Sequence, residues 1–447
     1  SLPGMFDVMW NNPIAKYFGA IGLFVSTIIF VYYTYIESWT LGFAFFSITK
    51  EYFGFSTLEQ MAGFLGSYQG EMAGHFSGIG TAYIFLLITI ILNFVILYKG
   101  VSKGIEKFAM IAMPALFIFG LFLMIYVFSI GTPDPAKPEN SVWNGLAFIW
   151  NPDYSKMWDS KVWLAAAGQV FFTLSVGMGT LQAYASYLKK NDDVALSSVA
   201  TASLNEFAEV VIGGSVAIPI AVAFFGVAST MAIANGGAFN LGFVSLSVIF
   251  QQLPFGNIIG FIWFMLLFAA GITSSVAMAQ PLISFLKEQF NLSHKKAVTI
   301  IGVGLFICVN FVVFFLKHGF LDEMDYWAGT FLLVIVALVE VIIFAWIFGI
   351  QKGWDELNRG AEIKIPNFYK FVIKYVTPAY LLFILGYWTI DDAIPTLLMH
   401  GKPAEDIPYL WGARLLMVII FGILVWMIYK AWKINKYEYE HFKVKGK

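Results

Sequence analysis

Long apolar runs separated by short polar segments are the main feature of the chain. Each run comes close to or exceeds the roughly 20 apolar residues with which a helix crosses a membrane. We predict ten spanning helices, at about residues 15–46, 82–98, 108–130, 162–187, 205–232, 255–285, 297–316, 326–350, 368–390 and 411–433. The pattern therefore predicts an all-α, polytopic membrane protein in which residues 1–447 form a single transmembrane domain.

Composition supports this class and argues against others. Of the 447 residues, 59% are hydrophobic and 12% are charged, which is about half the charged share of a soluble domain. A net charge of −1, without a basic patch, predicts no nucleic-acid partner. The single cysteine, Cys308, lies in an apolar run, so disulfides and thiolate metal sites are excluded. The sequence contains no ATP-binding, zinc-protease or serine-hydrolase motif, and we expect no enzyme.

The loops between the predicted spans alternate in charge. Lysine and arginine gather in every second loop and in the C-terminal tail. Because positively charged loops stay in the cytoplasm, we expect residues 1–14 to be a cytoplasmic loop and residues 434–447 a cytoplasmic tail. The segment 233–254 is too polar and too rich in glycine to span, and we expect an external re-entrant loop with short helices. The other external loops, richer in acidic residues and proline, are 131–161, 317–325 and 391–410.

The stretch "FFTLSVGMGT", residues 171–180, places small and polar residues at the centre of the fourth predicted span. If the backbone leaves helical geometry there, its freed polar groups must line a buried cavity. Freed carbonyl groups can then bind a cation or an ammonium group. The alternative is a close-packed face of small residues. Five small or polar residues within eight favour the interruption; these are Thr173, Ser175, Gly177, Gly179 and Thr180.

Two other spans carry oxygen-bearing side chains. In "AAGITSS", Thr273, Ser274 and Ser275 offer the hard ligands that a small alkali cation needs. Taken alone, this stretch favours the alternative, in which the hydroxyl groups bond to the preceding helical turn. In "LNEFAEV", at the start of the fifth predicted span, Asn205 and Glu209 share one helix face.

Isolated acidic residues in apolar runs need an explanation, because a buried carboxylate must be protonated, paired or bound to a cation. Glu206 is expected to face the cytoplasmic side, and Glu209 lies one turn deeper. For Glu37 we expect a structural hydrogen-bonding role, and the role of Glu340 stays open. The oxygen donors on at least three helices suit a small cation and a polar organic solute. They do not suit zinc or iron, because the five histidines are scattered.

Several stretches together resemble the neurotransmitter:sodium symporter family, in particular its prokaryotic amino-acid transporters. They occur in the family's order and cover nearly the whole chain: "YYTYIESWTLGFA", "GVSKGIEKFAMIAMP", "GQVFFTLSVGMGT", "YASYLKK", "LNEFAEVVIGGS", "AFFGVA", "GAFNLGF", "AGITSSVAMAQP" and "LDEMDYWAGT". The resemblance implies the leucine-transporter-type fold with inverted repeats, in the plasma (inner) membrane of a prokaryote. The fourth span would be a broken helix, split from Ser175 to Gly179.

The resemblance also implies a substrate site. Carbonyl groups of Phe172 and Thr173 and the hydroxyl of Ser175 would hold the substrate ammonium, and Tyr33 would donate to its carboxylate. The residues implied to contact substrate are Ile29, Tyr33, Phe172, Thr173, Ser175, Met178, Ser274 and Met278. Methionine is flexible and fits irregular apolar shapes, so Met178 and Met278 favour a broad apolar or aromatic amino acid.

Two sodium sites follow from the same resemblance. One would use Thr173, Asn205 and the substrate carboxylate, and the other the carbonyl of Ala270 with the hydroxyls of Thr273 and Ser274. Glu209 matches the position at which chloride-dependent relatives bind the anion, so we expect chloride independence. Asp325 would be the external gate acid, and Glu288 the internal gate acid, in place of the family's usual aspartate.

The front of the chain departs from the family, whose members have twelve spans. Residues 15–46 match the family's third span, so this chain would comprise helices 3–12. Both sodium sites would then lack ligands, and Asp325 would have only Lys317 as a weak basic partner. We expect coupled transport to require the absent helices, from a longer gene product or from a second chain; a family member with a changed role is the third explanation.

The expected function of the full-length form is sodium-coupled amino-acid symport by alternating access, with an amino acid and membrane lipid as its partners. One alternative is a proton-coupled or exchange transporter of the same fold, because the buried carboxyl of Glu209 can carry a proton. Thr273 and Ser274 argue against it. The other alternative is a non-transporting accessory membrane subunit.

Overall fold

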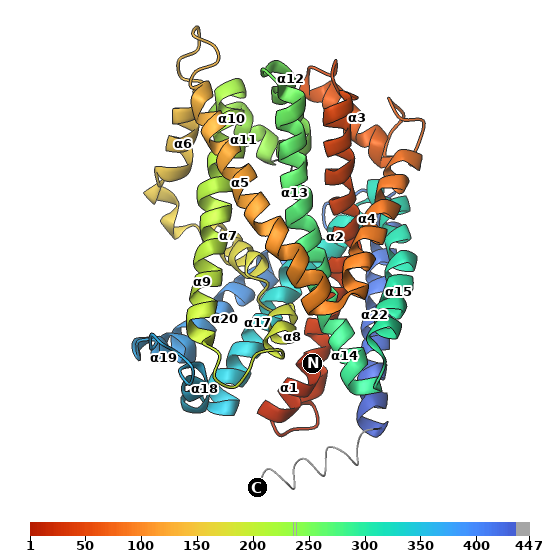
Figure 1. Ribbon diagram of the computed structural model, residues 1–447, viewed down its shortest axis with the longest axis vertical. Coiled ribbons are helices and arrows are strands. Elements are labelled where there is room, and N and C mark those ends of the chain that lie inside the picture. Colours follow the sequence, from red (N-terminus) through yellow and green to blue (C-terminus); the bar gives the residue numbers. More distant parts are fainter. Residues whose placement is uncertain (236, 238, 435–447) are drawn as a thin grey trace. The chain divides into compact units, whose positions relative to one another are not determined.

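The computed structural model describes residues 1–235, 237 and 239–434, with the side chains of Ser160, Lys161 and Leu164 left out (Figure 1). Every regular element in this part of the chain is a helix. The predicted cytoplasmic tail, apart from Ile434, lies outside the described residues.

The chain forms two compact units. The first comprises residues 1–32, 159–202 and 277–447, and the second comprises residues 33–158 and 203–276. Three helices contribute residues to both units: α2 (Ala15–Thr49), α9 (Val194–Glu206) and α13 (Gly256–Met278).

The first unit is organised around α17, which packs against α7 and α20. Buried side chains from these three helices, including Ala167, Val334 and Leu381, form one apolar cluster. The other elements of this unit are α1 (Leu2–Met9), α7 (Ser160–Thr173), α8 (Thr180–Ala185), α14 (Gln280–Phe290), α15 (His294–Phe315), η5 (Leu316–His318), α16 (Phe320–Met324), η6 (Asp325–Phe331), α17 (Leu332–Ile342), η7 (Ile343–Gly349), α18 (Ile350–Leu357), α19 (Phe368–Phe371), η8 (Val372–Val376), α20 (Thr377–Trp388), η9 (Thr389–Ala393), α21 (Ile394–Leu397) and α22 (Ile407–Ile434).

The second unit has an aromatic core. The buried ring of Phe43 on α2 contacts the rings of Tyr52, Phe64, Phe243 and Phe264. Its remaining elements are α3 (Leu58–Gln69), α4 (Gly80–Tyr98), η1 (Val101–Ile105), α5 (Glu106–Ile130), α6 (Val142–Trp150), η2 (Tyr154–Trp158), η3 (Phe207–Gly213), α10 (Gly214–Phe225), α11 (Val227–Asn235), η4 (Asn240–Ser245) and α12 (Leu246–Gln252).

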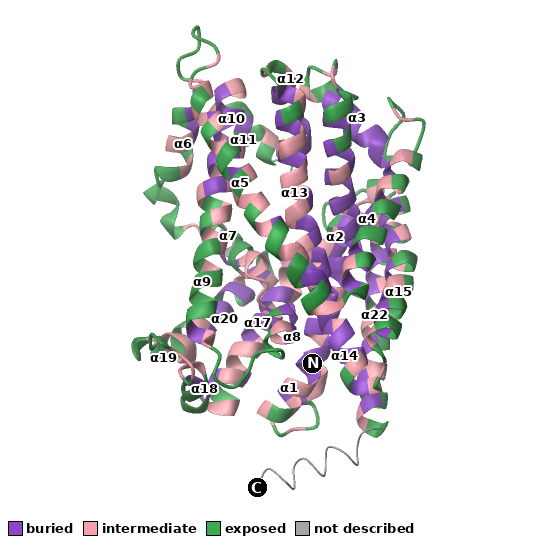
Figure 2. Cartoon of the chain, viewed as in Figure 1, coloured by how far each residue is buried: buried purple, intermediate pink, exposed green. Residues whose placement is uncertain are grey.

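Nine helical runs in the described part of the chain are long and apolar enough to cross a membrane. The predicted span 162–187 is absent from this set because its helix is interrupted between α7 and α8. The nine are Ala15–Thr49, Gly80–Tyr98, Val101–Ile130, Val194–Phe225, Gly256–Phe290, His294–His318, Phe320–Leu357, Phe368–Leu397 and Ile407–Ile434. In the apolar 18-residue window of each run, 78% of the residues of Ala15–Thr49 are buried, against 17% for Val101–Ile130. Helix α2 is therefore a core helix, while most of α5 is not covered by the protein (Figure 2).

The starting residue predicted for the fifth span was wrong. Its helical run begins at Val194 rather than at residue 205 and ends at Phe225. The hydroxyls of Ser197 and Thr201 bond to carbonyl groups one turn back, at 2.7 and 2.8 Å. Polar side chains that looked like a loop are therefore satisfied within the helix.

Two predicted loops contain helices. Residues Leu2–Met9 form α1, with Leu2 and Phe6 buried, so the segment 1–14 is not a loop throughout. The segment 233–254 contains the end of α11, then η4 and α12, as the expected short helices of a non-spanning segment.

Candidate substrate and cation site

The helix of the fourth predicted span is interrupted where the sequence places small and polar residues. The segment α7 ends at Thr173 and α8 begins at Thr180. Between them Ser175, Gly177 and Gly179 have left-handed backbones, with φ of 54°, 82° and 71°. Only glycine adopts this region readily, so Ser175 is the unusual member. The interruption confirms the prediction and leaves backbone polar groups for other partners.

A glutamate on α17 holds the interrupted segment. The backbone N–H of Gly177 donates to the carboxyl group of Glu340, and Gln182 Nε2 donates to Glu340 Oε1 at 2.9 Å. A side chain at Gly177 would collide with the backbone of Leu333, which lies on α17 as Glu340 does. The role of Glu340, left open by the sequence, is therefore to anchor the break between α7 and α8 against α17.

The start of α8 has spare polar capacity. Thr180 Oγ1 and Gln182 Oε1 are buried and have no hydrogen-bond partner within the described part of the chain. Buried polar atoms normally have a partner. These two atoms are therefore suited to binding water or a polar ligand beside the interruption.

In the second unit, three oxygen atoms of α13 converge. Thr273 Oγ1 and Ser274 Oγ donate to the carbonyl oxygen of Ala270 at 2.8 and 3.0 Å. This is the back-bonded arrangement that the sequence left as an alternative. Each hydroxyl oxygen keeps acceptor lone pairs, so the same arrangement also preorganises hard ligands for a cation.

A hydroxyl on α2 joins this cluster. Tyr33 forms a side-chain hydrogen bond with Ser274. The structure thus brings together the residue predicted to bind the substrate carboxylate and a predicted sodium ligand. Four oxygen atoms of the second unit, three on α13 and one on α2, therefore form a connected set.

A buried network fixes α13 next to this cluster. Asn93 Nδ2 donates to both carboxyl oxygens of Glu37, at 3.0 and 3.2 Å, and Ser275 Oγ donates to Asn93 Oδ1 at 2.6 Å. All three side chains are buried. The network confirms the structural role predicted for Glu37. Sequence reasoning missed Asn93, whose signal was an amide inside the apolar run "LLITIILNFVIL".

The predicted gate acid Asp325 has a neutral partner. Tyr32 donates its hydroxyl proton to Asp325 Oδ1 at 2.5 Å. Sequence reasoning missed a basic residue in this region, Arg414. It pairs with buried Glu323 at 2.6 Å and donates to two carbonyl groups near the end of α21. Trp327 also donates to Glu323. Arg414 therefore stabilises the region around α16 rather than pairing with Asp325.

The other predicted residues fall in one unit or the other. In the first unit Ile29 and Met178 are buried, Phe172 and Thr173 are half-buried, and Glu288 pairs with the amino group of Ser1. Met278, also in the first unit, lines an apolar cavity of about 220 Å³ between α2, α15 and α22. In the second unit, Asn205 near the end of α9 and Glu209 in η3 are half-buried, eleven and fifteen residues into their helical run.

The donor set fits a hard cation. The described residues contain no group of three or more histidine, cysteine or acidic side chains that could hold a metal ion. Carbonyl and hydroxyl oxygens, as at Ala270, Thr273 and Ser274, suit cations that prefer oxygen. A spanning helix with an interrupted backbone, in a chain that also carries an oxygen-rich spanning helix, is typical of secondary membrane transporters.

Comparison with known proteins specifies the family. Residues 55–434 match the sequence model of the Sodium:neurotransmitter symporter family. The chain belongs to this family, which consists of transporters and not of enzymes. It is a multi-pass integral membrane protein.

Relatives of the chain are similar over most of its length. An uncharacterized sodium-dependent transporter of Methanocaldococcus jannaschii is 32% identical over 291 residues, which are 64% of this chain and 56% of that protein. Another from Haemophilus influenzae is 29% identical over 306 residues, 65% of this chain and 63% of that protein. The chain thus spans less than two thirds of the length of these two relatives.

A solved structure has the same fold. The crystal structure of MhsT in complex with L-phenylalanine matches with a TM-score of 0.71 and 25% identity, over 86% of this chain and 83% of that chain. The match confirms the predicted all-helical, leucine-transporter-type fold.

Proposed function

We propose that the protein takes up an apolar or aromatic amino acid by sodium-coupled symport across the plasma membrane of a prokaryote. The observation that carries the proposal is the connected oxygen set of Tyr33, Ser274, Thr273 and the Ala270 carbonyl. Its hard donors suit sodium, and MhsT, which shares the fold, binds L-phenylalanine. The chain covers less than two thirds of the length of two of these relatives, and the proposal concerns the activity of the whole protein.

The proposed sodium ligands divide into two sets. Ala270, Thr273 and Ser274 already share hydrogen bonds, so they need little rearrangement to turn their lone pairs to an ion. Thr173 and Asn205, with the substrate carboxylate, form the second set. A half-buried carboxylate at Glu209 supplies a fixed negative charge near Asn205 on the same helix, and this charge removes the need for chloride.

The proposed substrate contacts come from the interrupted helix and from α2. Carbonyl groups of Phe172 and Thr173 and the Ser175 hydroxyl accept from the ammonium group, while Tyr33 donates to the carboxylate. The apolar side chain of the substrate contacts Ile29, Met178 and Met278. The Phe172 carbonyl accepts from the N–H of Ser175 at 3.1 Å within the turn, and its second lone pair can accept from the substrate ammonium group.

We propose alternating access as the mechanism. Asp325, held by Tyr32, lies at the external gate, and Glu288 lies at the internal gate. Glu340 keeps the break between α7 and α8 in one conformation against α17. Inward flow of sodium drives uptake of the amino acid.

Uptake of labelled L-phenylalanine into proteoliposomes tests the proposal. With the complete gene product, uptake should collapse when external sodium is replaced by potassium. Ser274→Ala should raise the sodium concentration needed for half-maximal uptake about tenfold, for loss of one charge-assisted contact. Thr299→Ala is the matched control, because its hydroxyl donates to the Lys295 carbonyl of its own helix at 2.9 Å and is not among the proposed sodium ligands. Uptake that persists without sodium would refute the coupling.

A further inference from the structure

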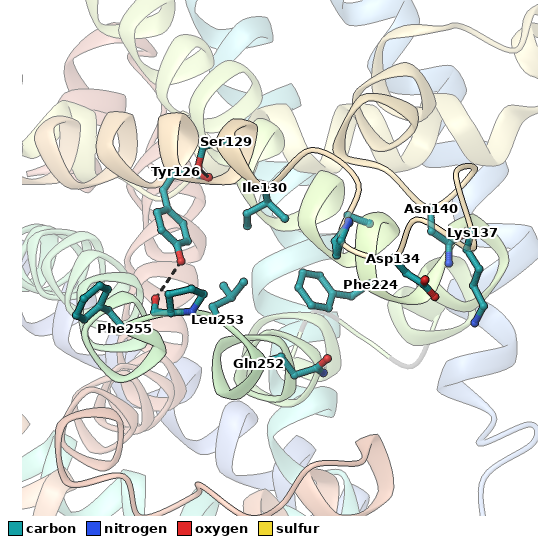
Figure 3. Close-up of a pocket in the computed structure, with 13 residues that line it drawn as sticks. Tyr126, Ser129, Ile130, Asp134, Lys137, Asn140, Phe224, Gln252, Leu253 and Phe255 are labelled. Atoms are coloured by element: carbon teal, nitrogen blue, oxygen red, sulfur yellow. Dashed lines mark hydrogen bonds between the residues drawn. The ribbon is translucent and has the colours of Figure 1, made fainter.

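The second unit contains a pocket that shares no residue with the candidate site. Its volume is about 710 Å³, which is within the range of small-molecule sites. The end of α5, the loop 131–140, the end of α10 and the turn between α12 and α13 surround it (Figure 3). The loop 131–140 lies in the segment 131–161, and residues 252–254 lie in the segment 233–254, both of which the sequence predicts to be external.

Hydrogen bonds order both sides of this pocket. Val142 N–H donates to the Gly131 carbonyl at 2.9 Å and closes the loop at its base. Asp134 Oδ1 accepts from the N–H of Ala136 at 3.0 Å, which directs this carboxyl group. On the other side, Tyr126 donates its hydroxyl proton to the carbonyl of Pro254 at 3.0 Å. The pocket is therefore built by folded segments and not by a free loop.

The pocket has a charged end and an apolar end. In Figure 3, Asp134, Lys137 and Asn140 of the loop lie on one side, and Tyr126 and Phe255 lie on the other. Phe224 lies between the two groups. No ion pair in the described part of the chain involves Asp134 or Lys137. One acid and one base are thus both available to a ligand.

Phe255 is held in an uncommon conformation at the apolar end. Its φ is 57°, which is unusual for a bulky residue. Its side chain is 75% exposed, so the fold does not use the ring for internal packing. A ligand with an apolar group would cover this ring together with that of Tyr126.

We propose that this pocket binds a free zwitterionic amino acid with an apolar or aromatic side chain. Asp134 accepts from the ligand ammonium group, Lys137 donates to its carboxylate, and the side chain lies against Tyr126 and Phe224. None of the sodium ligands proposed above lines this pocket, so binding here is independent of sodium. Binding in this pocket and the proposed transport function can therefore be tested separately.

The probe is 4-fluoro-L-phenylalanine, titrated against the purified, full-length protein in detergent with choline in place of sodium. Its ¹⁹F line should broaden with a Kd in the millimolar range, and unlabelled L-phenylalanine should reverse the broadening. Asp134→Asn and Lys137→Gln should each weaken binding about fivefold, as expected for an exposed charge pair. Glu139→Gln and Lys156→Gln, exposed residues outside the pocket, should leave it unchanged.

Variants of the other site separate the two proposals. Tyr33→Phe and Ser274→Ala should weaken only the binding that requires sodium. An aminophospholipid headgroup carries the same two charges, so vesicles containing phosphatidylethanolamine serve as a competitor. The proposal is overturned if no binding occurs without sodium, if the Asp134 and Lys137 variants bind normally, or if the lipid competes and L-phenylalanine does not.

Discussion

Replacing Glu340 by leucine tests whether this residue anchors the interrupted helix. The variant removes the acceptor for two donors, Gln182 Nε2 at 2.9 Å and the N–H of Gly177. An interhelical hydrogen bond in a membrane protein contributes about 0.6–1.7 kcal/mol, so the two together contribute about 1–3 kcal/mol. This free energy holds the break in its binding conformation. It corresponds to a factor of about 5–150 in the equilibrium constant between the anchored and the unanchored conformation.

Because only the anchored conformation binds substrate, the apparent affinity should fall by the same factor. The apparent affinity is measured by sodium-dependent binding of labelled L-phenylalanine to the complete protein in detergent. Glu340→Gln keeps one acceptor oxygen, and its loss of affinity should stay below about fivefold. Glu405→Leu, an exposed acid, controls for the general effect of removing a carboxylate.

Two results would refute this reasoning. If Glu340→Leu bound within about twofold of the parent protein, the two bonds would not control the break. If the glutamine variant lost as much affinity as the leucine variant, the charge of Glu340 and not its acceptor geometry would be the important property. Thermal unfolding of each variant shows whether it is folded.

Three further predictions concern other groups. Uptake should not change when chloride is replaced by gluconate, and Glu209→Ser should make uptake depend on chloride; a chloride requirement in the parent protein would contradict the role of Glu209. Asn93→Leu removes the amide that donates to both oxygens of the buried Glu37 carboxyl and should cost about 1–3 kcal/mol of stability, seen as a lower melting temperature. Asn310→Leu, whose amide bonds its own helix, should cost less. N–H groups of Leu196 and then Glu362 hold the pKa of Asp193 below its usual value of 3.8, so its contribution to stability is present at neutral pH and is lost as the pH falls through that lowered pKa. Asp193→Ala should therefore lower the melting temperature at pH 7, and an unchanged value would show that this cap has no effect.

Much of the fold could be predicted from local patterns. The apolar runs identified the spanning helices, because a helix in a bilayer must bury its backbone bonds and expose apolar side chains along about 20 residues. The break before Gly179 was also readable, since glycine and small polar residues are those that tolerate a left-handed backbone. The limits of α9 were misjudged because hydroxyl groups can bond within a helix and then resemble a loop in sequence.

Partners distant in sequence could not be predicted. Gln182 and Glu340 are 158 residues apart, and Glu323 and Arg414 are 91 apart. Sequence reasoning left Glu340 without a role and offered Lys317 to Asp325, whereas the hydroxyl of Tyr32 bonds that acid. Residue types limit which bonds can form, but only the packing of helices selects the bonds that do form.

By itself, the sequence determined that this is a helical membrane protein, which helix is broken, and which family it resembles. These properties depend on composition and short motifs, and each is a local consequence of the cost of exposing polar backbone to lipid. Tertiary structure alone decided that Glu340 anchors the break and that Tyr33 meets Ser274. It also brought a loop and two helix ends together around the pocket of Asp134 and Lys137. Such contacts depend on the directions of side chains from separate helices, which no single stretch of sequence contains.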